Sequence, residues 1–140
     1  MSGIELTSNF AKTVFGSPIT SIATSITLFP GAGALFPNPS GGNYFRLLLT
    51  DAATSNYNEI VLCTARSGDV LTVTRAVEST SALSWIAGDI IENVLTSGAF
   101  AGLQLTNTLG NYANDTAASA GGVPVGGNYR NGSVLMVRVV

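Results

Sequence analysis

Alternation of hydrophobic and polar residues is the clearest signal along this chain. Residues 24–29, 43–51 and 70–75 each place large apolar side chains at every second position, with polar residues at most of the positions between them. A period of two is typical of β-strands that bury one face. We predict further strands at residues 11–16, 59–65 and 90–95.

Short polar turns connect the three central strands. Residues 51–58 and 66–69 separate consecutive strand segments, and Gly68 can adopt the positive φ that a tight hairpin requires. The sequence therefore predicts a meander of three antiparallel strands. We expect residues 1–97 to form an all-β attachment domain, a small antiparallel β-sandwich or barrel.

Two long loops carry large apolar residues. Residues 30–42 are so rich in proline and glycine that we expect neither helix nor central strand there. Leu35 and Phe36 lie in this loop, which should pack them beneath itself or onto a neighbour. The loop at 76–89 holds Trp85, which we expect to close one end of the sandwich or barrel; an exposed ring that stacks on a ligand is the alternative.

Residues 98–127 are rich in glycine and other small residues. A short helix capped by Thr96 or Ser97 would place Phe100 and Leu103 on a narrow apolar stripe, although the glycines make this helix marginal. We expect the remainder of the segment, residues 115–127, to be a flexible linker that becomes extended at Val-Pro-Val.

A β-hairpin for subunit association is predicted at residues 128–140. Asn131-Gly132 is a strong hairpin-turn signal, and the strand after it, residues 133–140, is apolar on both faces. An uncovered strand of this kind favours aggregation, so we expect burial on both sides, partly by another subunit. The residues predicted at subunit or partner interfaces are Leu35, Phe36, Phe100, Leu103, Tyr129, Val134, Leu135, Met136, Val137 and Val139.

The charge content favours an assembled protein. Only 10% of residues are charged, against about 25% in typical globular domains, and the net charge is −2. Such a chain has little electrostatic protection against self-association, which favours a subunit packed among others over a free monomer coated with serine and threonine. The six cations are scattered, which argues against nucleic-acid binding.

Neither a membrane span nor a disulfide is expected. Residues 13–45 carry no charge, but they contain four prolines and no apolar run of about 18 residues. Residues 1–10 lack the basic and apolar regions of a signal peptide. Cys63 is the one cysteine of the chain, so it has no intramolecular partner and is expected to be a small buried hydrophobe.

Residues suited to catalysis are scarce. The chain has no histidine, which removes the commonest general base and metal ligand. Its carboxylates are spread singly, mostly in turns, where aspartate commonly accepts hydrogen bonds from the local backbone. No phosphate-binding glycine loop is present. We therefore expect no catalytic residue, no metal and no cofactor.

Three motifs occur in a specific order. Gly33-Ala34-Leu35-Phe36-Pro37 has the form G-x-x-F-P, residues 59–75 read E-I-V-x-x-T-A-R-x-G-D-x-L-T-V-x-R, and residues 78–89 are close to E-G-T-x-A-x-x-W-x-A-G-D. This order resembles a small β-domain of tail-fibre and related virion proteins of tailed bacteriophages. The family pattern R-G-Q-E-G-T reads Arg75-Ala76-Val77-Glu78-Ser79-Thr80 in this chain, so both glycines and the glutamine are replaced. Residues 120–140 also resemble a terminal segment of short phage structural proteins.

The resemblance implies a non-catalytic virion component, made in the cytoplasm of the bacterial host. It implies a homotrimeric tail-fibre or baseplate-associated protein that docks to other phage proteins. A capsid-decoration or head-fibre protein is one alternative, and an enzyme is another, which the sequence favours least. A carbohydrate-binding β-module, with a host-surface glycan as partner, remains a further alternative; its stacking residues would be Trp85, Tyr44, Tyr57, Tyr112 or Tyr129.

Overall fold

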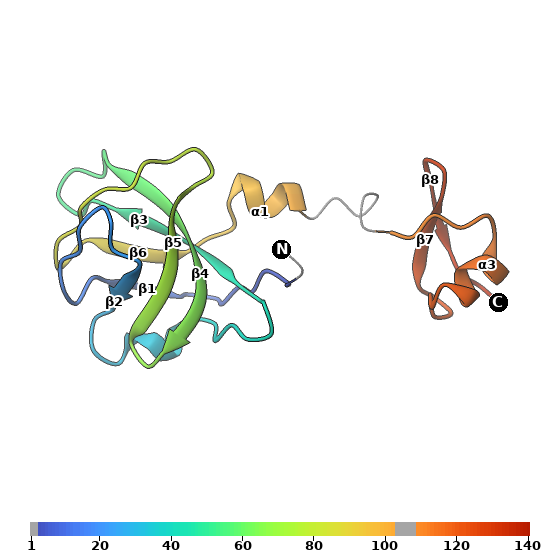
Figure 1. Ribbon diagram of the computed structural model, residues 1–140, viewed down its shortest axis with the longest axis horizontal. Helices are drawn as coiled ribbons and strands as arrows, with labels where there is room; N and C mark the ends of the chain where they lie inside the picture. Colours follow the sequence, from blue (N-terminus) through green and yellow to red (C-terminus); the bar gives the residue numbers. More distant parts are fainter. Residues whose placement is uncertain (1–2, 103–108) are drawn as a thin grey trace. The chain divides into compact units, whose positions relative to one another are not determined.

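The computed structural model describes residues 3–102 and 109–140, and the chain divides into an N-terminal unit, Met1–Ala99, and a C-terminal unit, Phe100–Val140. The fold is mostly β (Figure 1). Within the described residues there are two short α-helices, α1 (Ser97–Gly102) and α3 (Asp115–Ala120), and one 3-10 helix, η1 (Ala32–Leu35). None of these helices is long or apolar enough to cross a membrane.

The N-terminal unit contains one antiparallel sheet of six strands. The central strands β3, β4 and β5 are consecutive neighbours, so the predicted meander is confirmed. The sheet order is β1-β6-β3-β4-β5-β2. The strand bounds are β1 (Lys12–Val14), β2 (Ser25–Thr27), β3 (Phe45–Thr50), β4 (Asn58–Ser67), β5 (Val70–Val77) and β6 (Ile90–Asn93).

This sheet curls into a half-barrel. Its two edge strands, β1 and β2, meet just beyond their ends in a single antiparallel bridge between Phe15 and Leu28. The N–H of Gly16 donates to the carbonyl of Thr27 at 2.9 Å and closes one end of the curl. The two-sheet sandwich is therefore wrong, and the barrel alternative is confirmed in the coarser form of a curled sheet. Register shifts between β4 and β5 add twist, as β-bulges do.

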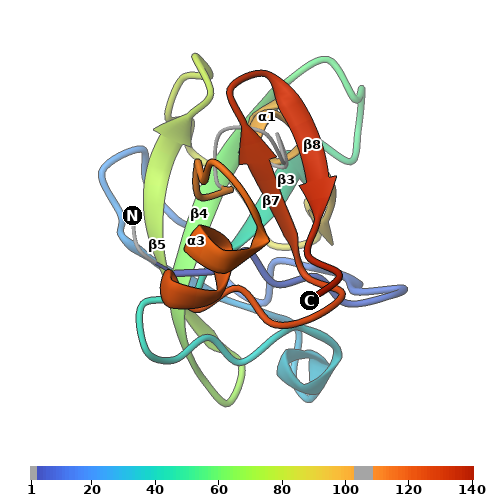
Figure 2. The same cartoon turned by 90° about the vertical axis from the view of Figure 1, so that its right-hand side faces the viewer.

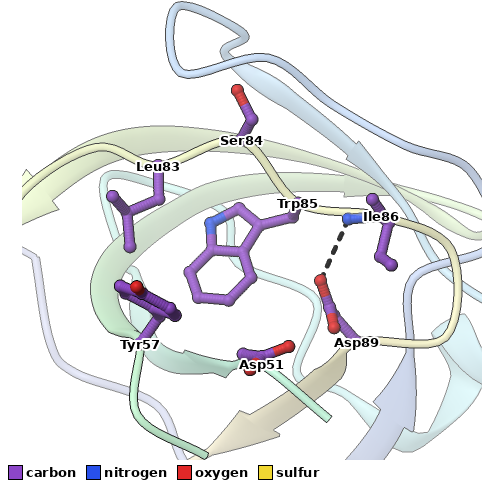
Figure 3. A pocket seen from close by; sticks show the side chains of 7 residues that line it. All are labelled: Asp51, Tyr57, Leu83, Ser84, Trp85, Ile86 and Asp89. Atoms are coloured by element: carbon purple, nitrogen blue, oxygen red, sulfur yellow. Dashed lines mark hydrogen bonds between the residues drawn. The ribbon is translucent and has the colours of Figure 1, made fainter. Parts of the chain in front are cut away.

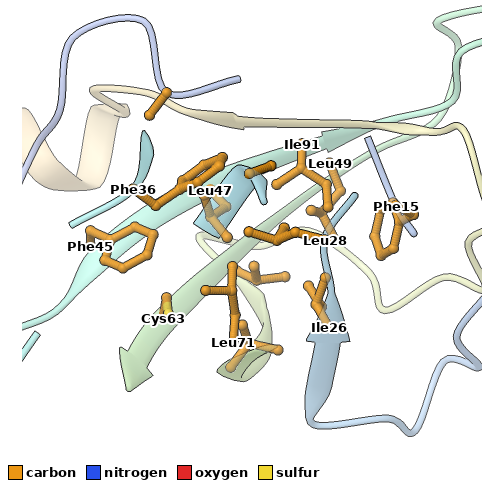
Figure 4. Packing of buried hydrophobic residues seen from close by; sticks show 14 of the residues in the cluster. Phe15, Ile26, Leu28, Phe36, Phe45, Leu47, Leu49, Cys63, Leu71 and Ile91 are labelled. Atoms are coloured by element: carbon orange, nitrogen blue, oxygen red, sulfur yellow. The ribbon is translucent and has the colours of Figure 1, made fainter. Parts of the chain in front are cut away.

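The core fills the inside of the curl (Figure 4). The predicted inward residues of β3, Phe45, Leu47 and Leu49, are all 0% exposed, because they occupy alternate positions on a strand with neighbours on both edges. Each large apolar side chain buried in this way contributes about 1.5–3 kcal/mol relative to an exposed one. Cys63 lies among them, fully buried as expected. Other core residues include Phe15, Ile26, Leu28, Leu71, Val73 and Ile91.

The proline- and glycine-rich loop differs from its prediction in containing η1. Gly31, at φ 82°, precedes this helix, and the N–H of Phe36 donates to the carbonyl of Gly33 at its end. One i→i+3 hydrogen bond is enough for such a short 3-10 segment, so the glycines do not prevent it. Phe36 is 3% exposed and stacks on Phe45 at 6.3 Å between ring centroids. Phe36 is thus a core residue and not a subunit contact, whereas Leu35 is 49% exposed.

The predicted helix after residue 96 is present as α1. Thr96 Oγ1 accepts a hydrogen bond from the N–H of Ala99 at 3.2 Å, which makes Thr96 the capping residue. The carboxylate of Glu78 accepts from the N–H of Gly98 at 2.8 Å and satisfies another free amide of the first turn. Phe100 lies on α1 and is 69% exposed; Leu103 lies outside the described residues.

In the C-terminal unit, α3 packs on a hairpin of β7 (Asn128–Asn131) and β8 (Val134–Val137) (Figure 2). The prediction of a flexible linker at residues 115–127 is wrong for its first half, which is α3. Asn114 caps this helix by accepting from the N–H of Ala117 at 2.9 Å, and Asp115 provides a negative charge in the first turn. Alanines then favour helix over linker.

The predicted terminal hairpin is confirmed, with its turn one residue later than expected. Asn131 pairs with Val134, so Gly132 and Ser133 form the two-residue loop. Gly132 has φ 61°, and a glycine at the first central position is what a type II′ turn requires. Gly68, at φ 59°, has the same position in the loop between β4 and β5.

Candidate functional site

The predicted association residues converge on β8 and the tail after it. Tyr129 of β7 pairs with Met136 of β8, and Tyr129 is 1% exposed because this face of the hairpin packs on α3. Leu135 and Val137 alternate with Met136 and therefore lie on the opposite face. They are 51% and 50% exposed, and Val139 beyond them is 71% exposed. We call Leu135, Val137 and Val139 the terminal surface.

The backbone of β8 is also open on one side. Among the described residues, β8 has one strand neighbour, β7, in a two-stranded sheet. The outer edge of such a strand presents N–H and C=O groups that can pair with another chain. A single chain covers only the face of residues 133–140 that packs on α3, so burial of the other face by another subunit remains a prediction.

The other predicted interface residues are distributed differently. Val134 is 57% exposed at the tip of the hairpin, and Met136 is half-buried. Tyr129 is a core residue of the C-terminal unit and is not available to a partner. Leu35 and Phe100 are exposed, but they lie on η1 and α1, away from β8 in the sequence.

The carboxylate of Asp115 holds the tail in place. It accepts hydrogen bonds from the Tyr129 hydroxyl at 2.6 Å, from the N–H of Val139 at 2.8 Å and from the N–H of Val140 at 3.3 Å. The bond from Tyr129, followed by the one from Val139, holds the pKa of Asp115 below its ordinary value. The same bond raises the pKa of Tyr129. Asp115 therefore anchors the residues that follow β8, a role that its turn-like sequence context did not indicate.

A buried ion pair lies in the N-terminal unit. Arg75 Nε and one terminal nitrogen each donate to Glu59 at 2.7 Å, in a bidentate arrangement. Glu59 is 0% exposed and also accepts from Trp85 Nε1 at 2.9 Å. Glu59 alternates in phase with Val61 and Cys63, so the sequence did contain a signal for a buried carboxylate that needs a cationic partner.

The hydrogen bonds of this ion pair are saturated. The guanidinium of Arg75 also donates to the carbonyls of Thr20, Ala23 and Leu83, so all five of its N–H groups have partners. Burial acts to raise the pKa of Glu59, but hydrogen bonds, first from Arg75 and then from Trp85, outweigh burial and lower it. A saturated ion pair has no free proton or lone pair for chemistry, and its arrangement is that of a structural clamp.

The backbone bulge explains how Arg75 reaches Glu59. Ala76 follows Arg75 with φ 55°, at the point where the register between β4 and β5 shifts. The N–H of Ala76 donates to Glu59 at 3.0 Å. The left-handed residue thus turns both the Arg75 side chain and a backbone amide toward the same carboxylate.

A pocket of about 320 Å³ opens beside Trp85 (Figure 3). Its lining comes from Asp51 and Tyr57 of the β3–β4 turn and from residues 83–86 and 89 of the loop before β6. Trp85 is 2% exposed and stacks on Phe15 at 6.1 Å, with 10° between the ring planes. Its ring is therefore largely covered, as expected of a residue that closes an end of the fold. A ring that stacks on a sugar needs one face open to solvent. Of the two aromatic residues that line the pocket, Trp85 and Tyr57, Tyr57 meets this requirement, because it is 62% exposed.

Backbone amides fix the two carboxylates of the pocket. Asp51 accepts from the N–H of Thr54 at 3.0 Å within its own turn, and the hydroxyl of Thr54 does most to lower the pKa of Asp51. Asp89 accepts from the N–H of Ile86 at 3.0 Å and from that of Ala52 at 3.1 Å. The bond to Ala52, next to Asp51, ties the two segments of the pocket together. Within residues 3–102 and 109–140, no group of three or more cysteines and carboxylates is arranged to hold a metal ion.

Comparison with known proteins identifies no relative: no family model matches the chain, and no curated protein matches it.

Proposed function

We propose that this chain is a non-catalytic structural subunit of a bacteriophage virion, a tail-fibre or baseplate-associated protein that assembles as a homotrimer through its terminal surface. The observation that carries the proposal is the exposure of Leu135, Val137 and Val139 beside an edge of β8 that has no strand neighbour among the described residues. Apolar area of this kind is stabilised by contact with another protein, and an open strand edge adds directional hydrogen bonds.

The motif resemblance gains support from contacts between the motifs. Gly33 of the G-x-x-F-P segment donates its N–H to Asp69 of the second motif at 2.8 Å. Arg66 Nε of the second motif donates to the carbonyl of Pro37 at 3.2 Å. Two segments that occur together in the resembled pattern thus form one structural unit, which gives a physical reason for their common order.

The departures from that pattern support it as well. Ala76 and Ser79 stand where the pattern has glycine, and their φ values are 55° and 64°. Glycine adopts positive φ without the cost that a Cβ imposes. The backbone of this chain therefore has the geometry that the glycines of the pattern would favour.

The N-terminal unit would then dock to another virion protein, and the C-terminal unit would join the copies. A capsid-decoration or head-fibre protein uses the same kind of subunit contact. Electron microscopy of particles carrying a tagged copy of the chain separates these positions: label at the tail supports the proposal, and label on the head supports the alternative.

Sedimentation velocity of the full chain tests the association surface. We expect the wild-type protein to sediment as a trimer and the double variant Leu135→Lys, Val137→Lys to sediment as a monomer, because two buried ammonium groups would have no partners. Ile22→Lys is the matched control, since Ile22 is 87% exposed in the N-terminal unit, and it should remain trimeric. A wild-type monomer at all concentrations, or a trimeric double variant, would overturn the proposed assembly.

A further inference from the structure

The pocket beside Trp85 combines features that neither the core nor the terminal surface needs. Its volume of about 320 Å³ lies at the lower end of small-molecule sites. Leu83 and Ile86 supply apolar walls, and the exposed ring of Tyr57 forms one side (Figure 3). This is a recess of the size and lining that a small organic group fills.

Charge distinguishes this recess from a plain apolar one. Asp51 and Asp89 both line it, and the seven lining residues include no lysine or arginine. The four salt bridges among the described residues all use glutamates, so neither aspartate is neutralised by a cationic side chain of this chain. The hydrogen bonds that these two carboxylates accept come from backbone amides and from the Thr54 hydroxyl, which orient them without compensating their charge.

We propose that this pocket binds a small organic cation, an alkylammonium or quaternary ammonium group, between Tyr57 and the carboxylates of Asp51 and Asp89. An aromatic face attracts such a cation through its quadrupole, apolar walls contact its methyl or methylene groups, and carboxylates balance its charge. A neutral sugar would leave the two charges uncompensated. A bare metal ion would contact the apolar walls without benefit.

The geometry of the lining is fixed before any ligand arrives. The N–H of Asp51 donates to the carbonyl of Tyr57 at 3.1 Å, which closes the turn that carries both residues. Asp89 links this turn to the Trp85 loop through Ala52. Preformed sites lose little conformational entropy on binding, so even a small cation can be held at a weak but specific affinity.

Trp85 makes the binding measurable. It is the one tryptophan of the chain and lines the pocket, so its fluorescence reports on this site. We would titrate the full-length protein with choline and, separately, with 3,3-dimethyl-1-butanol, which has the same shape with carbon in place of the charged nitrogen. Sodium chloride at equal ionic strength corrects for screening. We expect a saturable fluorescence change with choline and none with the neutral alcohol.

Variants identify the groups responsible. Tyr57→Leu should weaken choline binding about two- to fivefold, while Tyr57→Phe, which keeps the ring, should bind like wild type. Asp51→Asn should weaken it about fivefold or more, since one opposing charge is lost. Glu92→Gln removes one negative charge from β6, outside the pocket lining, and should leave the affinity unchanged.

Three results would overturn the proposal. These are equal response to choline and its neutral analogue, saturable binding of methyl glucoside or calcium in the absence of choline binding, and equal loss of affinity in Asp51→Asn and Glu92→Gln. Thermal melts of each variant separate loss of fold from loss of ligand. The pocket residues all lie in the N-terminal unit, so the outcome is independent of trimer formation at β8.

Discussion

The N–H of Gly33 donates to Oδ1 of Asp69 at 2.8 Å, and a Cβ added to Gly33 would lie 2.0 Å from the carbonyl oxygen of Gly68. The loop and the β4–β5 turn thus approach more closely than a side chain allows. Gly31 donates to the other oxygen of Asp69, also at 2.8 Å. Asp69 therefore binds η1 to the strand meander. Glycine is required at position 33 because a side chain would collide with the β4–β5 turn, and not because the backbone there has a positive φ.

We predict that Gly33→Ala destabilises the N-terminal unit by about 1–3 kcal/mol or more, because backbone would have to move to admit the methyl group. Chemical denaturation followed by Trp85 fluorescence measures this change. Ala34→Ser is the matched control at the next position of η1, where the side chain is exposed, and it should have an effect within about 0.5 kcal/mol. Equal stability of Gly33→Ala and wild type would show that the close approach is absent in solution.

The ion pair beneath Trp85 should be sensitive to loss of one partner. Glu59→Gln leaves the guanidinium of Arg75 buried without a counter-charge, and we expect a loss of about 3–5 kcal/mol in the free energy of unfolding. Removal of both groups in Glu59→Gln, Arg75→Leu should cost less than the sum of the single changes. A double-mutant cycle measured by urea denaturation checks this. Strict additivity of the two losses in unfolding free energy would contradict an energetic coupling between Glu59 and Arg75.

Ala76 and Ser79, left-handed residues near the end of β5, offer a stabilising change. We predict that Ala76→Gly and Ser79→Gly each raise the free energy of unfolding by about 0.5–1 kcal/mol, because relief of Cβ strain exceeds the added entropy of the unfolded glycine. The comparison variant is Ala65→Gly in β4, an exposed strand position without positive φ, which should lower stability. If all three glycine variants shift the melting temperature in the same direction, the strain argument is wrong.

The tether between Asp115 and Tyr129 should make the C-terminal unit sensitive to both acid and base. The pKa of Asp115 is lowered in the folded chain. Its contribution to the stability of the C-terminal unit is therefore present above the ordinary pKa of 3.8 and is lost as pH falls below it. The pKa of Tyr129 is raised, so its contribution is present up to the ordinary value of 10.0 and disappears as pH rises through the higher folded value.

Amide exchange and NMR shifts of Val139 and Val140 would follow this tether. We expect release of both amides below about pH 3.8, since their acceptor, the Asp115 carboxylate, is then protonated. At strongly alkaline pH the Tyr129 hydroxyl ionises and its hydrogen bond to Asp115 is lost. Asp115→Asn should weaken the attachment of Val139 and Val140 at neutral pH. It should also remove the increase in exchange of their amides that acid causes in the wild type. Persistence of that increase in Asp115→Asn would assign it to another group.

Period-two alternation was enough to place the sheet, since apolar residues two positions apart share one face whatever the tertiary context. Residues 45, 47 and 49 are buried for this reason. The sequence did not distinguish a sandwich from a curled sheet, because the choice depends on whether the ends of β1 and β2 meet, and the bridge from Phe15 to Leu28 has no local signal.

The errors arose where one short-range signal competed with another. The glycines and prolines of residues 30–42 favoured a loop, so η1 was not predicted. The small residues of α3 favoured a linker, although Asn114 followed by Asp115 is an ordinary helix start. The pocket could not be predicted, because Tyr57 and Ile86 are brought together by two separate turns. The exposure of Leu135 agrees with its prediction as an interface residue, but the apolar pattern does not identify the molecule that would cover it.

Burial raises the pKa of the Cys63 thiol to about 12, so at neutral pH this sulfur scarcely forms the thiolate that maleimides attack. The native chain accordingly offers such reagents almost nothing to label. A cysteine placed at exposed Ser81 would carry one fluorophore per polypeptide, and the number of bleaching steps in a single particle would then count the copies that it contains.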